Sequence, residues 1–273
     1  MATVRAFTAF DMRTVLLPSY DHIVVQATPD SDASVIGYVT GSWATELEGV
    51  FDLRSDDSAV GSITGLRQRH ATTEIFEAAG VRTSADAVLD LTQARDNDGL
   101  LAYLLSGRDQ LLGSSQNDHM VGYRGADALS GDRGADTLFG RAGADTLSGG
   151  RGSDRLGGGA GADLLDGGAC PDLLRGGDGR DVFRFGDATA ADGDRIADFA
   201  TGRDRIDLSA IGAKPALGDQ AFRWICDAGF TGSAGELRFD GGTLAGDIDG
   251  DGAADFAIRL DPDADLGGAD LIL

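Results

Sequence analysis

Nine aspartates recur at intervals of nine residues through the middle of this 273-residue chain, and an apolar side chain follows each of them two residues later. They are Asp109, Asp118, Asp127, Asp136, Asp145, Asp154, Asp163, Asp172 and Asp181. A spacing kept without slippage indicates a solenoid whose repeating unit is nine residues long. Evenly spaced carboxylates suit the binding of hard divalent cations, which prefer oxygen ligands.

The unit Gly149–Gly157 shows how such a repeat folds: glycine stands at positions one, two and four, aspartate at six and Leu156 at eight. Because glycine tolerates positive φ angles, the first half predicts a tight turn. The last three residues suit a short strand whose leucine points into a narrow core. Two units then complete one 18-residue coil of a parallel β-roll, and the aspartates stack in two files. One file is Asp109, Asp127, Asp145, Asp163 and Asp181; the other is Asp118, Asp136, Asp154 and Asp172.

Within a file, the coils bring carboxylates to a spacing of roughly 5 Å, the separation of neighbouring strands. Like charges at this distance, partly out of water, repel strongly, so the bare roll is expected to be unstable. A divalent cation between coils removes the repulsion, and an all-oxygen cage of six or more ligands selects Ca²⁺ over Mg²⁺. The alternative is that the aspartates are turn residues that bond to their own backbone and hold no metal.

The pattern Gly-Gly-x-Gly-x-Asp-x-apolar-x resembles the RTX (repeats-in-toxin) nonapeptides, the hemolysin-type calcium-binding repeats. The resemblance implies that carbonyls at positions two and four join the aspartate of one coil, and that carbonyls at positions one and three join the aspartate of the next. In the first file the implied ligand sets are Tyr123, Gly125, Asp127, Gly140, Ala142 and Asp145; then Arg141, Gly143, Asp145, Gly158, Ala160 and Asp163; then Gly159, Gly161, Asp163, Gly176, Asp178 and Asp181. In the second file they are Asp132, Gly134, Asp136, Gly149, Arg151 and Asp154; then Gly150, Gly152, Asp154, Gly167, Ala169 and Asp172.

Some units depart from this pattern. Position four is Gln116 in one unit and Cys170 in another, where glycine is expected, and the first unit, which contains Asp109, has no glycine pair. The sites that use Asp109 and Asp118 are therefore expected to be weaker or empty. In total the resemblance implies about five to seven Ca²⁺ ions in the roll.

The residues after the roll resemble the C-terminal domain of serralysin-type secreted proteases. The resemblance covers about residues 113–273 and rests on Asp194–Ser209, Gly235–Phe239, Gly246–Phe256 and Gly268–Leu273. It implies a β-sandwich-like cap and an uncleaved C-terminal signal read by the type I secretion machinery. Within it, the loop with Asp247, Asp249, Asp251 and Asp255 begins like an EF-hand loop but lacks the glutamate at position twelve. This loop is either a further cation site or an acidic hairpin turn.

The remaining segments complete the predicted architecture, whose fold class is all-β apart from one or two helices. Residues 1–82 predict a small β-rich domain with strands at 4–10, 23–27, 34–41, 49–53 and 59–66. Residues 83–106 predict a helical cap and linker, with Thr83 and Ser84 at one helix N-terminus and a second helix over 96–105 covering the open end of the roll. The parallel β-roll follows at residues 107–185 and the serralysin-like cap at residues 186–273.

The formal net charge of −22 disfavours nucleic acid as a partner and favours cations. The roll is far less acidic than its flanks, with nine arginines against 12 aspartates. No segment is apolar over a length that spans a membrane, and the N-terminus lacks the features of a Sec signal. Cys170 and Cys226 form either a disulfide or two free buried thiols.

A protease is excluded by the histidines, because His22, His70 and His119 cannot form the closely spaced pair of a zinc protease. No Gly-x-Ser-x-Gly elbow is present either. The sequence therefore predicts a non-catalytic, extracellular Ca²⁺-binding protein that leaves the cell by type I secretion and folds on binding Ca²⁺. The alternatives are an adhesin or glycan-binding module that acts through residues 1–85, and an enzyme with an unrecognised N-terminal active site.

Overall fold

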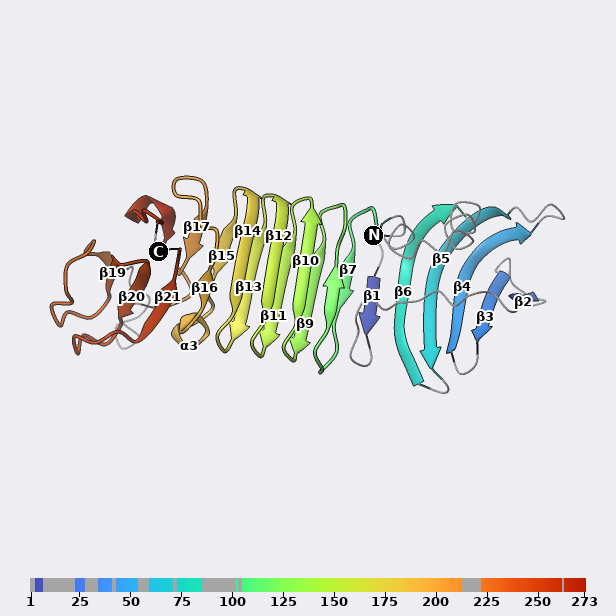
Figure 1. Cartoon of the computed structure of the whole chain (residues 1–273), viewed down its shortest axis with the longest axis horizontal. Helices are drawn as coiled ribbons and strands as arrows, with labels where there is room; N and C mark the ends of the chain where they lie inside the picture. Colours follow the sequence, from blue (N-terminus) through green and yellow to red (C-terminus); the bar gives the residue numbers. More distant parts are fainter. Residues whose placement is uncertain are drawn as a thin grey trace.

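A computed structural model describes residues 3–6, 23–27, 34–40, 43–53, 59–70, 73–84, 102, 105–212, 222–261 and 263–273. The described chain is nearly all β, as predicted, and forms an elongated array with the roll at its centre (Figure 1). None of the helices in these ranges is long and apolar enough to cross a membrane.

The roll consists of short strands that alternate between two parallel sheets. One sheet contains β7 (Gln110–Leu112), β9 (Ala128–Arg133), β11 (Thr146–Arg151), β13 (Leu164–Ala169) and β15 (Val182–Arg184). The other contains β8 (His119–Val121), β10 (Thr137–Ala142), β12 (Arg155–Gly161) and β14 (Leu173–Gly179). Within a sheet, residues 18 apart are partners, as in Leu129, Leu147 and Leu165. The predicted coil of two nonapeptides is confirmed.

A single apolar column fills the space between the two sheets. It contains the predicted residues at position eight, each no more than 2 % exposed: Leu111, Met120, Leu129, Leu138, Leu147, Leu156, Leu165, Leu174 and Phe183. The column is only one side chain wide per unit, so the roll has little apolar core for its length. The turns are correspondingly tight: Gly143 has a φ of 144°, and a Cβ there would collide with the carbonyl of Gly125 in the preceding coil.

The C-terminal segment extends both sheets of the roll. After the short helix α3 (Ala188–Ala191), β16 (Arg195–Ile196) pairs with β14, and β17 (Arg205–Asp207) pairs with β15 and with β22 (Leu271–Ile272). The meander of β19 (Glu236–Asp240), β20 (Thr243–Asp247) and β21 (Phe256–Arg259) joins β16, with β18 (Arg223–Trp224) at its outer edge. The 3-10 helix η3 (Gly268–Asp270) leads into β22.

The N-terminal strands join the roll as well. They are β1 (Thr3–Ala6), β2 (Ile23–Ala27), β3 (Ser34–Thr40), β4 (Trp43–Leu53), β5 (Ala59–His70) and β6 (Thr73–Ser84). Strands β2 to β6 form an antiparallel series, and β1 lies between β6 and β7 (Figure 1). The edge of β7 is thus covered by a strand.

The sequence analysis missed one strand of this region. Strand β6 was not predicted, and it ends at Thr83 and Ser84, the expected helix N-terminus. Strands β4 and β5 are also longer than predicted, because each pairs along its length with its neighbours. Most of the two predicted helices, at 85–101 and 103–104, lies outside the described residues.

Candidate metal centre

The aspartates of each file are linked to one another by a ladder of hydrogen bonds. The backbone N–H of Asp127 donates to Oδ1 of Asp145 at 2.8 Å, and the N–H of Asp145 donates to Oδ1 of Asp163 at 2.8 Å. The other file repeats the pattern at 2.7 Å between Asp136 and Asp154. One oxygen of each carboxylate therefore links neighbouring coils, and does not bond to its own turn as the metal-free alternative supposes.

The second carboxylate oxygen of these aspartates takes part in no such hydrogen bond. The Oδ2 atoms of eight aspartates are buried and accept no hydrogen bond from any described residue: Asp127, Asp136, Asp145, Asp154, Asp163, Asp172, Asp181 and Asp194. Buried polar atoms nearly always have a partner, and a buried anionic oxygen without one is strongly unfavourable. The arrangement requires either protons or cations at these oxygens.

Turn carbonyls converge on the same places as these oxygens. A Cβ on Gly149 would collide with Asp154 Oδ2 and would lie 2.5 Å from the carbonyl oxygen of Gly167, one coil further on. Gly158 is in the same relation to Asp163 Oδ2 and to the carbonyl of Gly176. Glycine at position one thus leaves a small space lined by oxygen atoms, as a hard cation requires.

The carbonyls predicted as ligands at position three also take part in the ladder between coils. Those of Ala142, Arg151, Ala160 and Ala169 each accept one N–H from position four of the coil before, at 2.8 to 3.1 Å. A carbonyl oxygen has two lone pairs, so each keeps one for a further partner. At position two, Tyr123, Asp132 and Arg141 have left-handed φ angles of 68° to 79°, where other units have glycine.

The electrostatics of the files reflect the crowding of carboxylates. Burial, and then the charges of neighbouring aspartates, raise the pKa of Asp127, Asp136 and Asp172 from an ordinary 3.8 to about 7, although the backbone N–H donors act in the opposite direction. The same causes raise the pKa of Asp163 to about 6 and that of Asp194 to about 8. Burial also raises the pKa values of Asp145, Asp154 and Asp181.

The N-terminal end of the second file differs from the rest. Asp118 Oδ2 accepts hydrogen bonds from the backbone N–H of Ser114 at 2.6 Å and from its hydroxyl at 3.0 Å. Ser114 stands at position two, where the pattern has glycine. Ser114 thus gives Asp118 Oδ2 the hydrogen-bond partners that the other Oδ2 atoms lack, and the weaker site at Asp118 stays a prediction.

Two aspartates beyond the nine-residue phase extend the files, and a third, Asp198, bonds to a turn beside them; the sequence analysis missed all three. Asp194 and Asp204 accept the N–H groups of Asp172 at 2.7 Å and Asp181 at 3.2 Å, across 22 and 23 residues. Asp198 accepts the N–H groups of Gly176 and Gly177, each at 3.0 Å. The signal for the first two was present, because buried Ile196 and Ile206 follow them two residues later as in the repeats.

The predicted Asp247 loop joins β20 to β21 as a hairpin, and one oxygen each of Asp247, Asp249 and Asp255 lies within 4.8 Å of the others. Asp251 is not part of this group. Both oxygens of buried Asp247 accept loop N–H groups, from Gly250 at 2.7 Å and Gly252 at 3.0 Å. These carboxylates are satisfied by their own loop, unlike those of the roll. Cys170 and Cys226 are both free and exposed, so they form no disulfide and the expected burial of two free thiols was wrong.

Replacing Gly149 by alanine tests the space at position one. The added methyl group would collide with Asp154 Oδ2, so we expect Gly149→Ala to displace a cation there and to destabilise the roll by about 2 kcal/mol. The measurement is the Ca²⁺ midpoint and thermal stability by circular dichroism. Gly186→Ala is the matched control, since its Cβ would meet nothing within 4 Å, and should change stability by less than about 0.5 kcal/mol. Equal effects of the two substitutions would contradict the assignment.

Known proteins resemble this chain mainly in the residues of the roll. The family model of the RTX calcium-binding nonapeptide repeat matches four times, at residues 105–138, 121–156, 139–169 and 157–187. The metalloprotease AprA of Pseudomonas entomophila (strain L48) is 43% identical over 77 residues, which are 26% of this chain and only 15% of that relative. Among solved structures, the AlgE6R3 subunit of the Azotobacter vinelandii mannuronan C5-epimerase is 28% identical, covers 61% of this chain and 78% of its own, and has a TM-score of 0.23. The family matches fall on the coils that carry the aspartate files, so residues 105–187 are RTX calcium-binding nonapeptide repeats.

Proposed function

We propose that this chain is a secreted, non-catalytic Ca²⁺-binding protein whose roll folds as Ca²⁺ binds. The observation that carries the proposal is the row of buried Oδ2 atoms that accept no hydrogen bond from the described residues. A cation between adjacent coils gives each of these oxygens a partner and removes the repulsion within the file.

The ions would lie between coils that are 18 residues apart, in the ligand sets implied by the repeats. In the first file the aspartate pairs are Asp127 with Asp145, Asp145 with Asp163, and Asp163 with Asp181. In the second file they are Asp136 with Asp154 and Asp154 with Asp172, and buried Asp194 extends this file by one further pair. Most other ligands are turn carbonyls, so their side chains are free to vary.

Sharing of aspartates makes binding cooperative in this proposal. Asp145, Asp154 and Asp163 each belong to two neighbouring ligand sets, so an ion in one site orders part of the next. Because no preformed site exists in the unfolded chain, the free energy of binding becomes free energy of folding. This compensates for a core that is a single column of side chains.

Coupled folding of this kind suits export. RTX-type sites of moderate affinity remain empty at cytosolic Ca²⁺ concentrations and fill where Ca²⁺ is in the millimolar range. The resemblance of the C-terminal segment to serralysin-type proteins supports the type I secretion machinery as the route. The Asp247 loop is not included among the proposed sites, because its carboxylates already accept N–H groups of the loop.

Direct measurement of bound Ca²⁺ tests the proposal. Isothermal titration calorimetry of the metal-free protein should show several ions binding cooperatively, with dissociation constants of about 10⁻⁴ to 10⁻³ M. Mg²⁺ at the same concentrations should not replace Ca²⁺, because the smaller ion demands a tighter octahedral cage. Binding of a single ion, or equal binding of Mg²⁺, would refute the assignment of the files as Ca²⁺ sites.

A further inference from the structure

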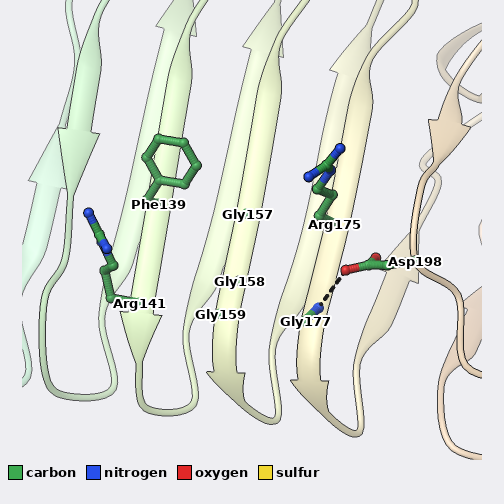
Figure 2. A pocket seen from close by; sticks show the side chains of 8 residues that line it. All are labelled: Phe139, Arg141, Gly157, Gly158, Gly159, Arg175, Gly177 and Asp198. Carbon is green, nitrogen blue, oxygen red and sulfur yellow. Dashed lines mark hydrogen bonds between the residues drawn. The ribbon is translucent and has the colours of Figure 1, made fainter.

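A groove of about 400 Å³ runs across the outer face of the nine-stranded sheet and reaches the turns beside the aspartate files, where Gly177 and Asp198 line it (Figure 2). Phe139 and Arg141 of β10 line one side, and Arg175 of β14 lines the other. The floor between them is the backbone of Gly157, Gly158 and Gly159 in β12.

The groove exists because one unit lacks an outward side chain. Position nine of successive coils in this sheet is Val121, Phe139, Gly157 and Arg175. At Gly157 no side chain stands between Phe139 and Arg175, whose strands are two spacings, about 10 Å, apart. A Cβ on Gly157 would already touch the Phe139 ring, at 3.0 Å from Cδ1. The ring is 37 % exposed and is the one large apolar side chain of the described roll residues that is exposed.

The charges around the groove are mostly positive and unpaired. Arg141, Arg155 and Arg175 are exposed, and within the described ranges their side chains make neither an ion pair nor a hydrogen bond. Two arginines on the opposite sheet are paired instead: Arg184 with Asp166 at 3.5 Å, and Arg205 with Asp270 at 3.3 Å.

One acid lies at the end of the groove, but its oxygens are in use. Asp198 accepts the N–H groups of Gly176 and Gly177, and Arg203 donates to the carbonyl of Gly177 close by. In a chain with a formal net charge of −22, this face thus combines unpaired guanidinium groups with an exposed ring. Such a face is complementary to an anionic ligand.

We propose that this groove binds an acidic polysaccharide whose sugar rings carry carboxylate groups. A sugar ring can lie on the glycine floor with its C–H face against the negative face of the Phe139 ring. Its carboxylates can then accept paired N–H donors from Arg141 and Arg175, in the geometry that guanidinium groups favour.

The groove fits other macromolecules less well. A peptide strand would need an open sheet edge, whereas β10, β12 and β14 are paired with strands on both sides. Nucleic acid needs a broad basic surface, which so acidic a chain does not offer. A membrane surface selects a protruding apolar face, and here a single ring borders a concave floor.

The test is calorimetric titration of the Ca²⁺-loaded full chain with a short, non-gelling oligogalacturonate, beside a neutral maltooligosaccharide of equal length. We expect the anionic oligosaccharide to bind, more weakly as salt increases, and the neutral one not to bind. Gly157→Val should lower the affinity at least about tenfold by filling the groove, without a change in charge. The pair Arg141→Gly and Arg175→Gln should lower it by about tenfold or more.

The variants are chosen so that folding and binding can be separated. Arg141 has a φ of 79°, where glycine is relaxed, so Arg141→Gly should not disturb the turn. Arg184→Gln removes the same charge from the opposite sheet and should leave the affinity unchanged. If circular dichroism shows that Gly157→Val does not fold in Ca²⁺, the affinity of the Arg141→Gly and Arg175→Gln double variant tests the proposal. The proposal is overturned if the oligogalacturonate does not bind, if all variants bind it equally, or if the neutral sugar binds equally well. It is also overturned if phosphatidylserine vesicles, titrated in parallel, are the one ligand that binds. None of these outcomes depends on how many Ca²⁺ ions the roll binds, so they are distinguishable from a failure of the proposed Ca²⁺ sites.

Discussion

Removal of Ca²⁺ with excess chelator at about pH 8 is expected to unfold the roll, with loss of its β-sheet signal in far-UV circular dichroism. At this pH the carboxyl groups of Asp127, Asp136, Asp163 and Asp172 are mainly ionised, since their pKa values are about 6 to 7. The described residues offer their buried Oδ2 atoms no hydrogen-bond donors. The apolar column cannot compensate, because it contributes a single buried side chain per nonapeptide. The antiparallel strands β2 to β6 lie outside the aspartate files, so part of the signal should remain.

Trypsin can locate the unfolded segment. The roll contains nine arginines between residues 107 and 185, so an unfolded roll offers many cleavage sites, whereas a folded one protects its backbone within parallel sheets. We expect rapid cleavage at these arginines in chelator and protection after Ca²⁺ is added back. Mg²⁺ at the same concentration is the control and should not protect. A roll that stays protected in excess chelator at about pH 8 would contradict the coupling of folding to Ca²⁺.

Much of the roll could be predicted from the sequence because its structure is local and repeated. A nine-residue period fixes which residues are 18 apart, and parallel pairing then places Asp127 above Asp145 and Leu129 above Leu147. The burial of the whole apolar column followed from the same period.

The parts that the sequence did not reveal depend on pairing between distant segments. Nothing local indicates that Thr3–Ala6 pairs with β7, more than a hundred residues away. Asp194 and Asp204 were missed because the chain between the coils is longer there, with helix α3 inserted before Asp194. The groove beside Phe139 was not predicted either, because the repeat pattern constrains the turns and the core and leaves outward positions such as Gly157 free.

The raised pKa values predict an unusual dependence of stability on pH for the metal-free protein. Burial raises the pKa of Asp127, Asp136 and Asp172 to about 7 in the folded roll, well above the ordinary 3.8 of an unfolded chain. Between these values the folded state binds more protons than the unfolded state, so the free energy of unfolding falls as pH rises. The slope is at most about 1.4 kcal/mol per pH unit for each such carboxyl group.

We therefore expect the metal-free roll to be most ordered at about pH 5 and to lose its structure as the pH rises through about 6 to 8, the opposite of ordinary acid denaturation. The measurement is circular dichroism of Ca²⁺-stripped protein over this range. Because protons and Ca²⁺ compete for the same oxygens, the Ca²⁺ midpoint should also rise as the pH falls. Saturating Ca²⁺ is the control: it keeps the carboxylates ionised and partnered, so the loss of structure towards about pH 8 should disappear. A metal-free roll that is more ordered at about pH 8 than at about pH 5 would show that the buried carboxylates do not limit its stability.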